Sequence, residues 1–191
     1  NVIVFAPFFT EYRVFIESQG ASVNVVPASF PDLGLNLEAL KECINDKTVA
    51  VILNSPNNPT GAIIPESDII KLASLLNKKS QELGRAIYII ADEPYRELVF
   101  TGEKVPYIPC YYENSFVCYS YSKALSLPGE RIGYLLVGRN TNNIDDVYAA
   151  IKGAGRTLGY VCASTLFQEL IPYCLGITSD LSVYKENQDI L

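Results

Sequence analysis

Apolar stretches rich in β-branched residues recur along the chain, and helical patterns separate several of them. Short apolar runs of this kind, bounded by turn residues, are typical of strands that are buried on both faces of a sheet. We therefore predict strands at Val2–Ala6, Ser22–Val26, Val49–Leu53, Ala86–Ala91, Ser115–Tyr119 and Arg131–Val137.

Amphipathic patterns between and after these runs predict the helices. They lie at Thr10–Gln19, Leu37–Ile44, Glu66–Leu83, Asp145–Lys152, Ser164–Cys174 and Ser179–Leu191. Two of them stop at Gly20 and Gly84, because glycine readily takes the left-handed conformation that ends a helix. Alternating strands and helices predict an α/β fold, a three-layer α/β/α sandwich around a mostly parallel sheet. The ligand site of such a sheet lies beyond the carboxyl ends of its strands.

Composition narrows the functions that this fold could serve. The 191 residues are 49% hydrophobic and 19% charged, and no linker interrupts them, so we expect residues 1–191 to form one domain. A net charge of −6 and the lack of a basic run exclude nucleic acid and anionic membranes as partners. The apolar stretches are far shorter than the roughly 20 residues of a membrane span, so we expect a soluble domain.

The side chains available for chemistry are also restricted. Without histidine the chain cannot form a Ser-His-Asp or Cys-His site, or any metal site that uses histidine. Its five cysteines are odd in number and contain no C-x-x-C pair, which argues against a disulfide framework and a zinc site. We interpret Cys43, Cys110, Cys118, Cys162 and Cys174 as small hydrophobic residues in a reducing cytoplasm.

Polar residues follow three of the predicted strands. The segment Asn58–Gly61 has the sequence Asn-Pro-Thr-Gly, Asp92 follows the run Ala86–Ala91, and Lys123 follows the run Ser115–Tyr119. Each has a plain alternative: the first could be only a turn, Asp92 could cap a following helix, and a lysine after a strand is usually a solvated charge.

Taken together, these segments resemble the fold-type I pyridoxal-phosphate enzymes, specifically the class I and II aminotransferases such as aspartate aminotransferase. The motifs follow one another in the family's order along nearly the whole chain. They are Asn58–Gly61, Asp92–Tyr95 (Asp-Glu-Pro-Tyr), Ser120–Lys123 (Ser-Tyr-Ser-Lys) and Gly129–Gly133 (Gly-Glu-Arg-Ile-Gly). The resemblance implies the large cofactor-binding domain of that fold, with pyridoxal 5′-phosphate as cofactor and no metal.

The resemblance also implies a role for each matched residue. Lys123 would form an imine with the cofactor aldehyde and later move a proton, and Asp92 would pair with the pyridine nitrogen. Asn58 and Tyr95 match positions that bind the phenolic oxygen of the cofactor. The remaining matches are Ser120, Ser122 and Arg131 for the phosphate, and Phe9 for stacking on the ring. An aromatic residue at a strand end is more often part of the core.

Complete family members are longer than this chain, so the resemblance makes it an internal fragment that lacks the N-terminal arm and the C-terminal small domain. We expect it to be inactive by itself and its parent to be a cytoplasmic homodimer. The expected reaction is transfer of an amino group between an amino acid and a 2-oxo acid. A carbon-sulfur β-lyase, a lyase similar to aminocyclopropane-carboxylate synthase, and a ligand-sensing domain without catalysis remain alternatives.

The segment Gly153–Gly159 is similar to a dinucleotide-binding fingerprint. It does not open a helix directly after a strand, and Leu158 stands where the motif's last glycine belongs. We therefore reject this interpretation. The resemblance to the aminotransferases implies that Arg156, within this segment, could reach the active site of a neighbouring subunit.

Overall fold

Six strands form one sheet in the computed structural model, which describes residues 1–31, 33–177 and 179–190. Their bounds are β1 Val2–Phe5, β2 Val23–Val26, β3 Ala50–Asn54, β4 Tyr88–Asp92, β5 Ser115–Ser120 and β6 Gly133–Val137. All of the predicted strands are confirmed, and their ends differ from the predicted ends by one or two residues.

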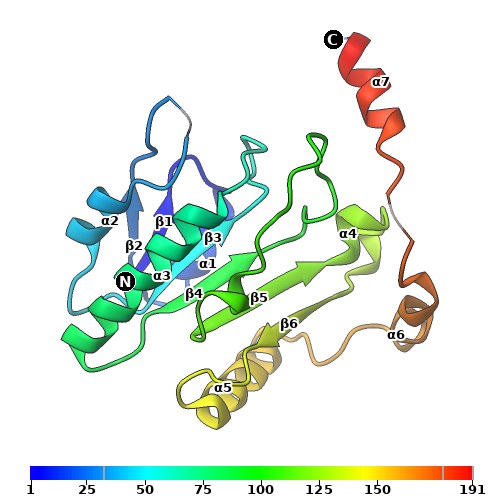
Figure 1. Cartoon of the computed structure of the whole chain (residues 1–191). Coiled ribbons are helices and arrows are strands. Elements are labelled where there is room, and N and C mark those ends of the chain that lie inside the picture. The colour runs from blue at the N-terminus through cyan, green and yellow to red at the C-terminus, as the bar shows by residue number, and fades with distance from the viewer. Residues whose placement is uncertain (32, 178, 191) are drawn as a thin grey trace.

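The strand order is β2-β1-β3-β4-β5-β6, as Figure 1 shows. The first five strands are parallel, and β6 runs antiparallel to β5, which confirms the prediction of a mostly parallel sheet. In the register, Asn54 of β3 lies opposite Asp92 of β4, and Asp92 lies opposite Cys118 of β5. The carboxyl ends of these three strands therefore lie at one edge of the sheet.

The helices are mostly those that the pattern predicts. They are α1 Glu11–Glu17, α2 Leu37–Cys43, α3 Glu66–Leu83, α4 Tyr121–Ala124, α5 Ile144–Thr157, α6 Thr165–Leu170 and α7 Ser182–Ile190. The predicted helix Ser164–Cys174 continues after α6 as a 3₁₀ helix at Ile171–Cys174, because Pro172 has no N–H for an α-helical hydrogen bond. The prediction Ser179–Leu191 began too early, and Leu191 lies outside the described residues.

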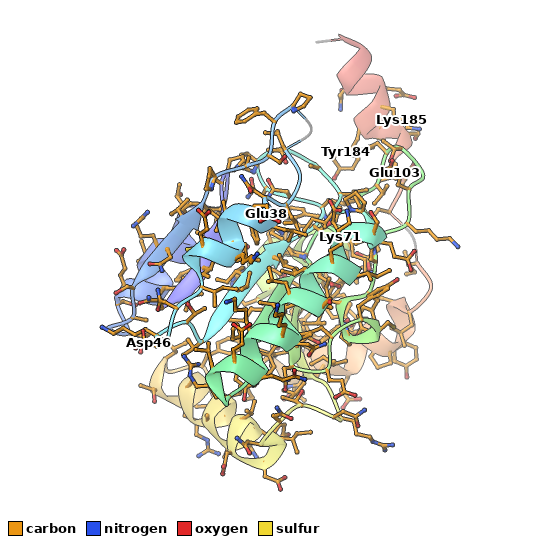
Figure 2. The ribbon with its side chains drawn as sticks, turned by 60° about the vertical axis from the view of Figure 1, so that its left-hand side comes forward. Glu38, Asp46, Lys71, Glu103, Tyr184 and Lys185 are labelled. Carbon is orange, nitrogen blue, oxygen red and sulfur yellow. The ribbon has the colours of Figure 1, made fainter. Side chains whose placement is uncertain are left out.

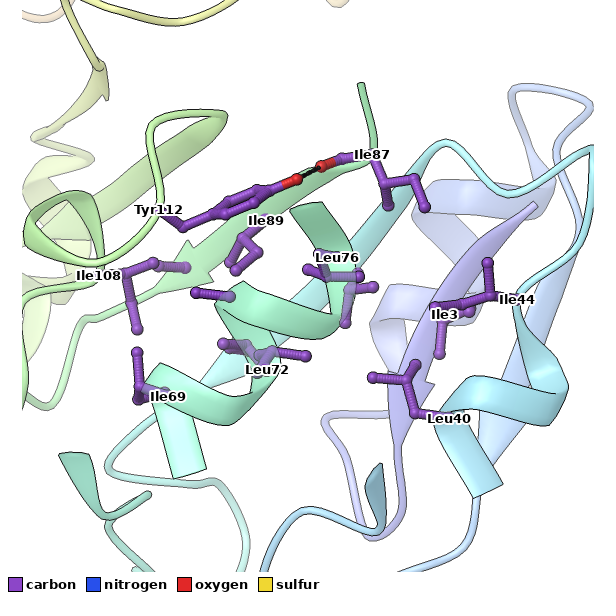
Figure 3. Close-up of a cluster of buried hydrophobic side chains, with 14 of the residues drawn as sticks. Ile3, Leu40, Ile44, Ile69, Leu72, Leu76, Ile87, Ile89, Ile108 and Tyr112 are labelled. Atoms are coloured by element: carbon purple, nitrogen blue, oxygen red, sulfur yellow. Dashed lines mark hydrogen bonds between the residues drawn. The ribbon is translucent and has the colours of Figure 1, made fainter. Parts of the chain in front are cut away.

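Successive side chains along the strands point to opposite faces of the sheet and pack in two hydrophobic cores, one on each face. Ile3 and Val51 pack with α2 and α3, whereas Val2, Val4 and Ala50 pack with α1 on the opposite face. Figure 3 shows the first core, in which the hydroxyl of Tyr112 donates to the backbone oxygen of Ile87 at 2.6 Å. Two cores with the sheet between them are the three-layer sandwich that the sequence predicts.

Helices α2 and α3 lie side by side over one face of the sheet, and Figure 2 shows Glu38 and Lys71 on their outer surface. Helices α5, α6 and α7 follow β6 in the chain. Helix α7 lies away from the sheet (Figure 1). Helix α5 is longer than predicted and contains Gly153 and Gly155, which confirms that this segment is no dinucleotide-binding loop. Among the described residues, no helix has the length and apolarity that a membrane span requires.

Candidate functional site

Asp92 is the last residue of β4, so it lies at the carboxyl edge of the sheet. Its Oδ2 accepts a hydrogen bond from the buried hydroxyl of Tyr12, and its backbone oxygen accepts one from the Asn54 side chain at 2.8 Å. Burial raises the pKa of Asp92, and the Tyr12 hydrogen bond lowers it. Turns and no helix follow Asp92, so it is not a helix cap.

A continuous set of contacts leads from Asp92 to Lys123. The side-chain oxygen of Asn54 accepts from the backbone N–H of Asn58 at 2.6 Å, and the Asn58 side chain donates to the Tyr95 hydroxyl at 3.3 Å. The Lys123 ammonium lies 5.8 Å from the centre of the Tyr95 ring. Residues from three distant stretches of the sequence therefore meet at this edge.

The site is open on the lysine side. Lys123 is exposed, and it lies in the short helix α4 directly after β5. Its place over the Tyr95 ring is a cation–π arrangement, which holds an amine near the ring without burying it. Lys123 is thus a solvent-accessible amine beside the Tyr95 ring.

Ser120, Ser122 and Arg131 line one cavity of about 500 Å³. The two hydroxyl oxygens of Ser120 and Ser122 are 2.6 Å apart, and Ser120 also accepts from the backbone N–H of Ser122 at 3.1 Å. Ser120 thus caps the N-terminus of α4. The guanidinium of Arg131 donates to the Pro128 backbone oxygen at 2.7 Å.

Phe9 lies beside the same edge of the sheet, against Tyr12. The two ring centres are 5.6 Å apart in an edge-to-face arrangement, and Phe9 packs against the core on the α1 face. Phe9 thus lies at the edge of the core, as expected of an aromatic residue at a strand end. It also contacts Tyr12, which in turn bonds to Asp92. Stacking on a cofactor ring stays a prediction.

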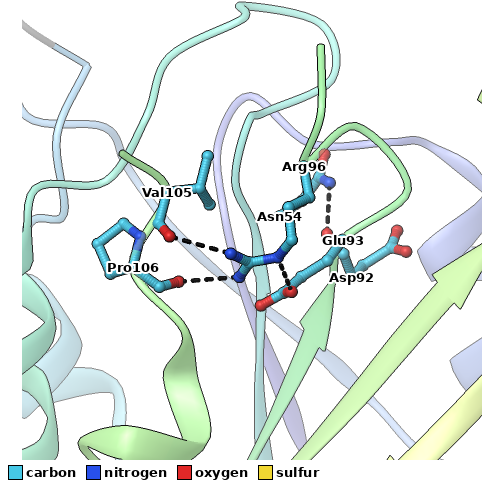
Figure 4. Close-up of polar contacts among 6 residues, drawn as sticks. All are labelled: Asn54, Asp92, Glu93, Arg96, Val105 and Pro106. Atoms are coloured by element: carbon cyan, nitrogen blue, oxygen red, sulfur yellow. Dashed lines mark hydrogen bonds and ion pairs between the residues drawn. The ribbon is translucent and has the colours of Figure 1, made fainter. Parts of the chain in front are cut away.

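The turn after Asp92 is held by a buried ion pair, which Figure 4 shows. Glu93 pairs with Arg96 at 2.6 Å, and the Arg96 guanidinium also donates to the backbone oxygens of Val105 and Pro106, each at 3.0 Å. Burial raises the pKa of Glu93, and Arg96 opposes that rise. This clamp fixes the turn that carries Tyr95.

The thiol nearest the site is Cys118, opposite Asp92 in the sheet. Burial, with smaller effects of the nearby carboxylates, raises the pKa of Cys118 to about 12, so the thiol stays protonated and is a poor nucleophile. Cys110 and Cys162 are exposed, and the other three cysteines are partly buried. In the described part of the chain, no cluster of His, Cys, Asp or Glu could hold a metal ion.

Sequence reasoning missed Tyr12, Asn54 and Tyr160. Tyr12 lies in α1, three residues after Phe9, in the segment that directly follows β1, and its place after that strand is the signal that could have found it. Asn54 directly precedes the Ser-Pro turn at the end of β3. Tyr160 donates to the backbone oxygen of Arg131, 29 residues away, and no local pattern indicates that contact.

The site combines a lysine, a carboxylate, and a group of hydroxyls with a guanidinium at the carboxyl edge of a parallel sheet. This combination is that of a fold-type I pyridoxal-phosphate enzyme. The family model for aminotransferase class I and II matches residues 1–175, and the chain belongs to that family. Enzymes of this family use pyridoxal 5′-phosphate as their cofactor.

Known relatives agree with this assignment. An aminotransferase from Eubacterium rectale of known structure is 55% identical, superposes with a TM-score of 0.95, and is matched over 98% of this chain and 47% of its own. Aspartate aminotransferase of Thermotoga maritima is 35% identical over 71% of this chain and 35% of its own length. Histidinol-phosphate aminotransferase of Methanococcoides burtonii is 31% identical over 70% and 34%. The chain thus spans about a third of the curated relatives it matches.

The residues present fit the cofactor. Asp92 is a largely buried carboxylate whose second oxygen can accept from a ring nitrogen, since Tyr12 takes only Oδ2. The Ser120 and Ser122 hydroxyls and the Arg131 guanidinium, which line one cavity, are the donor types that bind a phosphate dianion. Lys123 supplies an exposed amine beside the Tyr95 ring.

Proposed function

We propose that the full-length protein transfers an amino group between an amino acid and a 2-oxo acid with pyridoxal 5′-phosphate. One observation carries this proposal: Asp92, Asn58, Tyr95 and Lys123 are joined by consecutive contacts at one edge of the sheet. When bound, the cofactor supplies an aldehyde that reacts with amines and a ring that accepts electrons from the substrate α-carbon.

Lys123 has two tasks in this proposal. Its Nζ would bind the cofactor aldehyde covalently, and its neutral amine would move a proton at the substrate α-carbon. The Tyr95 ring keeps the amine near the site throughout. A lysine suits both tasks because its amine is a nucleophile when neutral and a base when freed.

Asp92 keeps a proton on the ring nitrogen, because a charged carboxylate favours the protonated ring. Its hydrogen bond from Tyr12 favours the charged form of the carboxyl group and fixes its orientation. In this proposal Tyr95 and Asn58 donate together to the phenolic oxygen, and the 3.3 Å between the Tyr95 hydroxyl and the Asn58 side-chain nitrogen supports this. Phe9 stacks on the ring in this proposal, and Ser120, Ser122 and Arg131 bind the phosphate.

The relatives support an aminotransferase over the lyases and the sensing domain, since each of those described above has an aminotransferase name. The proposed substrates are accordingly small molecules, an amino acid and a 2-oxo acid. We also propose a cytoplasmic homodimer. Exposed apolar side chains after β6 support the dimer, among them Leu158 (76%), Val161 (71%) and Leu166 (70%). Arg156 on α5 is exposed, and we propose that it reaches the neighbouring subunit's site.

Two measurements on the full-length protein test the proposal. Incubation with amino acids and 2-oxoglutarate should yield glutamate, and release of pyruvate and ammonia alone would contradict amino transfer. Borohydride should fix the cofactor on Lys123, and Lys123→Ala should abolish both the adduct and the activity. Lys152→Ala is a matched control, because Lys152 also lies over a tyrosine ring, 5.3 Å from the centre of Tyr148. The fragment of residues 1–191 should be inactive.

A further inference from the structure

Arg131 has an unusual backbone for its place in the site. Its φ and ψ are 53° and 45°, the left-handed region that side chains other than glycine rarely adopt. It ends the 3₁₀ helix Pro128–Glu130 and directly precedes Ile132, whose backbone oxygen accepts from Tyr121 at 3.1 Å. A residue in this conformation persists only where its surroundings hold it there.

Tyr160 holds the backbone of Arg131 from a distant part of the chain. Its hydroxyl donates to the Arg131 backbone oxygen, and its side chain lines the same cavity as Ser120, Ser122 and Arg131. This contact comes from the segment after α5, 29 residues beyond Arg131. Tyr160 thus contacts the backbone of Arg131, whereas the Arg131 guanidinium donates to the Pro128 backbone oxygen.

The end of α5 places Tyr160. The N–H of Gly159 donates to the Arg156 oxygen at 2.9 Å, and the N–H of Tyr160 donates to the Gly155 oxygen at 3.0 Å. Together with a φ of +77° at Gly159, these two bonds form a Schellman cap, which sets the direction in which the chain leaves a helix. Gly159 of the rejected dinucleotide motif thus has a structural use.

We propose that Tyr160 is a positioning residue of the phosphate cradle. By holding the Arg131 backbone in the left-handed conformation, it keeps the guanidinium on the cavity that Ser120 and Ser122 line. Gly159 serves the same purpose one step further away, because the cap at this glycine directs Tyr160 toward Arg131. This inference rests on the proposed function, since it takes the cavity to be the site of the cofactor phosphate.

The test compares two ligands in the full-length apo protein, pyridoxal 5′-phosphate and pyridoxal, which lacks the phosphate. Loss of one hydrogen bond predicts that Tyr160→Phe weakens pyridoxal 5′-phosphate binding about five- to tenfold, as measured by absorbance titration, and leaves pyridoxal binding unchanged. Gly159→Ala should give the same selective loss, because alanine is strained at this φ. Tyr173→Phe, at a tyrosine that is 84% exposed, and Gly153→Ala, at an open position within α5, should change neither affinity.

Further outcomes separate the possible failures. In an Arg131→Ala background, Tyr160→Phe should have no additional effect, and an undiminished effect there would overturn the proposed role. Equal weakening of both ligands, or full affinity in Tyr160→Phe while the wild type binds normally, would overturn the role of Tyr160 and leave the proposed function standing. A wild type that binds no pyridoxal 5′-phosphate would overturn both. Thermal unfolding of each apo variant verifies that it is folded.

Discussion

The hydroxyl of Tyr12 donates to Oδ2 of Asp92, a contact between the first helix and the fourth strand across 80 residues of sequence. Burial and the nearby Asp92 charge raise the pKa of Tyr12, so the phenol stays protonated and acts as a donor. Because the bond favours the charged form of Asp92, it opposes the rise in pKa that burial causes. Tyr12 thus favours the ionised form of the acid in a partly buried site.

Tyr12→Phe should lower kcat/KM of the full-length protein about tenfold at neutral pH, as expected for the loss of a hydrogen bond to a charged group. Without the donor the pKa of Asp92 rises further, so the acidic limb of the pH–rate profile should move to higher pH. Tyr148→Phe, at an exposed tyrosine of α5, is the control. Full activity with an unshifted profile would show that Tyr12 does not act on Asp92.

Asp92→Asn should stabilise the apo protein at neutral pH while lowering activity by about a hundredfold or more. The folded protein binds the Asp92 proton more tightly than the unfolded chain does, because burial raises the pKa. Neutral Asp92 therefore contributes fully to stability at pH values below the pKa it has in the unfolded chain. That contribution is lost as the pH rises through the higher pKa of the folded protein. Above that pH the charged group destabilises the fold, and asparagine removes this cost.

Thermal unfolding of apo protein across a pH series measures the Asp92→Asn effect. The gain in Tm over the wild type should be present at pH 7 and should shrink in acid, where wild-type Asp92 is neutral. Asp46→Asn, at an exposed loop position, should give no such pH-dependent gain. A lower Tm for Asp92→Asn at pH 7 would contradict the prediction.

Arg96→Met should destabilise the protein by about 3 kcal/mol, because it leaves the buried Glu93 carboxylate without its partner and frees two backbone oxygens. Without Arg96 the pKa of Glu93 rises further, so the deficit should shrink at acid pH as Glu93 takes up a proton. Urea unfolding measures both effects.

The control for Arg96→Met is Arg13→Met. Arg13 pairs with Glu17 at 3.1 Å, but both side chains are about half exposed, and such surface pairs contribute about 0.5 kcal/mol or less. Equal losses for the two variants would mean that the Glu93–Arg96 pair is no stronger than a surface pair.

Gly133→Ala should destabilise the protein by about 2–3 kcal/mol and weaken cofactor binding. A Cβ at Gly133 would lie 2.3 Å from the backbone oxygen of Tyr119 and 3.1 Å from Cα of Ser120, so β5 and β6 must move apart. Gly129→Ala, at an open position, should be tolerated. Chemical denaturation and pyridoxal 5′-phosphate titration measure the two effects, and wild-type values for both would show that the strand pair adapts.

The strands, most of the helices and the place of Asp92 at the edge of the sheet could be predicted from the sequence for a local reason. Buried strands of a parallel sheet require unbroken apolar runs, and a residue such as Asp92 at the end of such a run must reach the edge of the sheet. Lys123, Asn58 and Arg131 were likewise predicted, because each lies in a motif whose wording resembles that of one family.

Tertiary structure alone decided how these residues are held. The antiparallel direction of β6, the bond from Tyr12 to Asp92, and the bond from Tyr160 to the Arg131 backbone join segments that carry no mark of one another in the sequence. The exposure of Lys123 belongs to the same group. Hydrophobic patterning depends on the period of each element, whereas a single hydrogen bond between distant elements depends on the packing of the whole sheet and its helices.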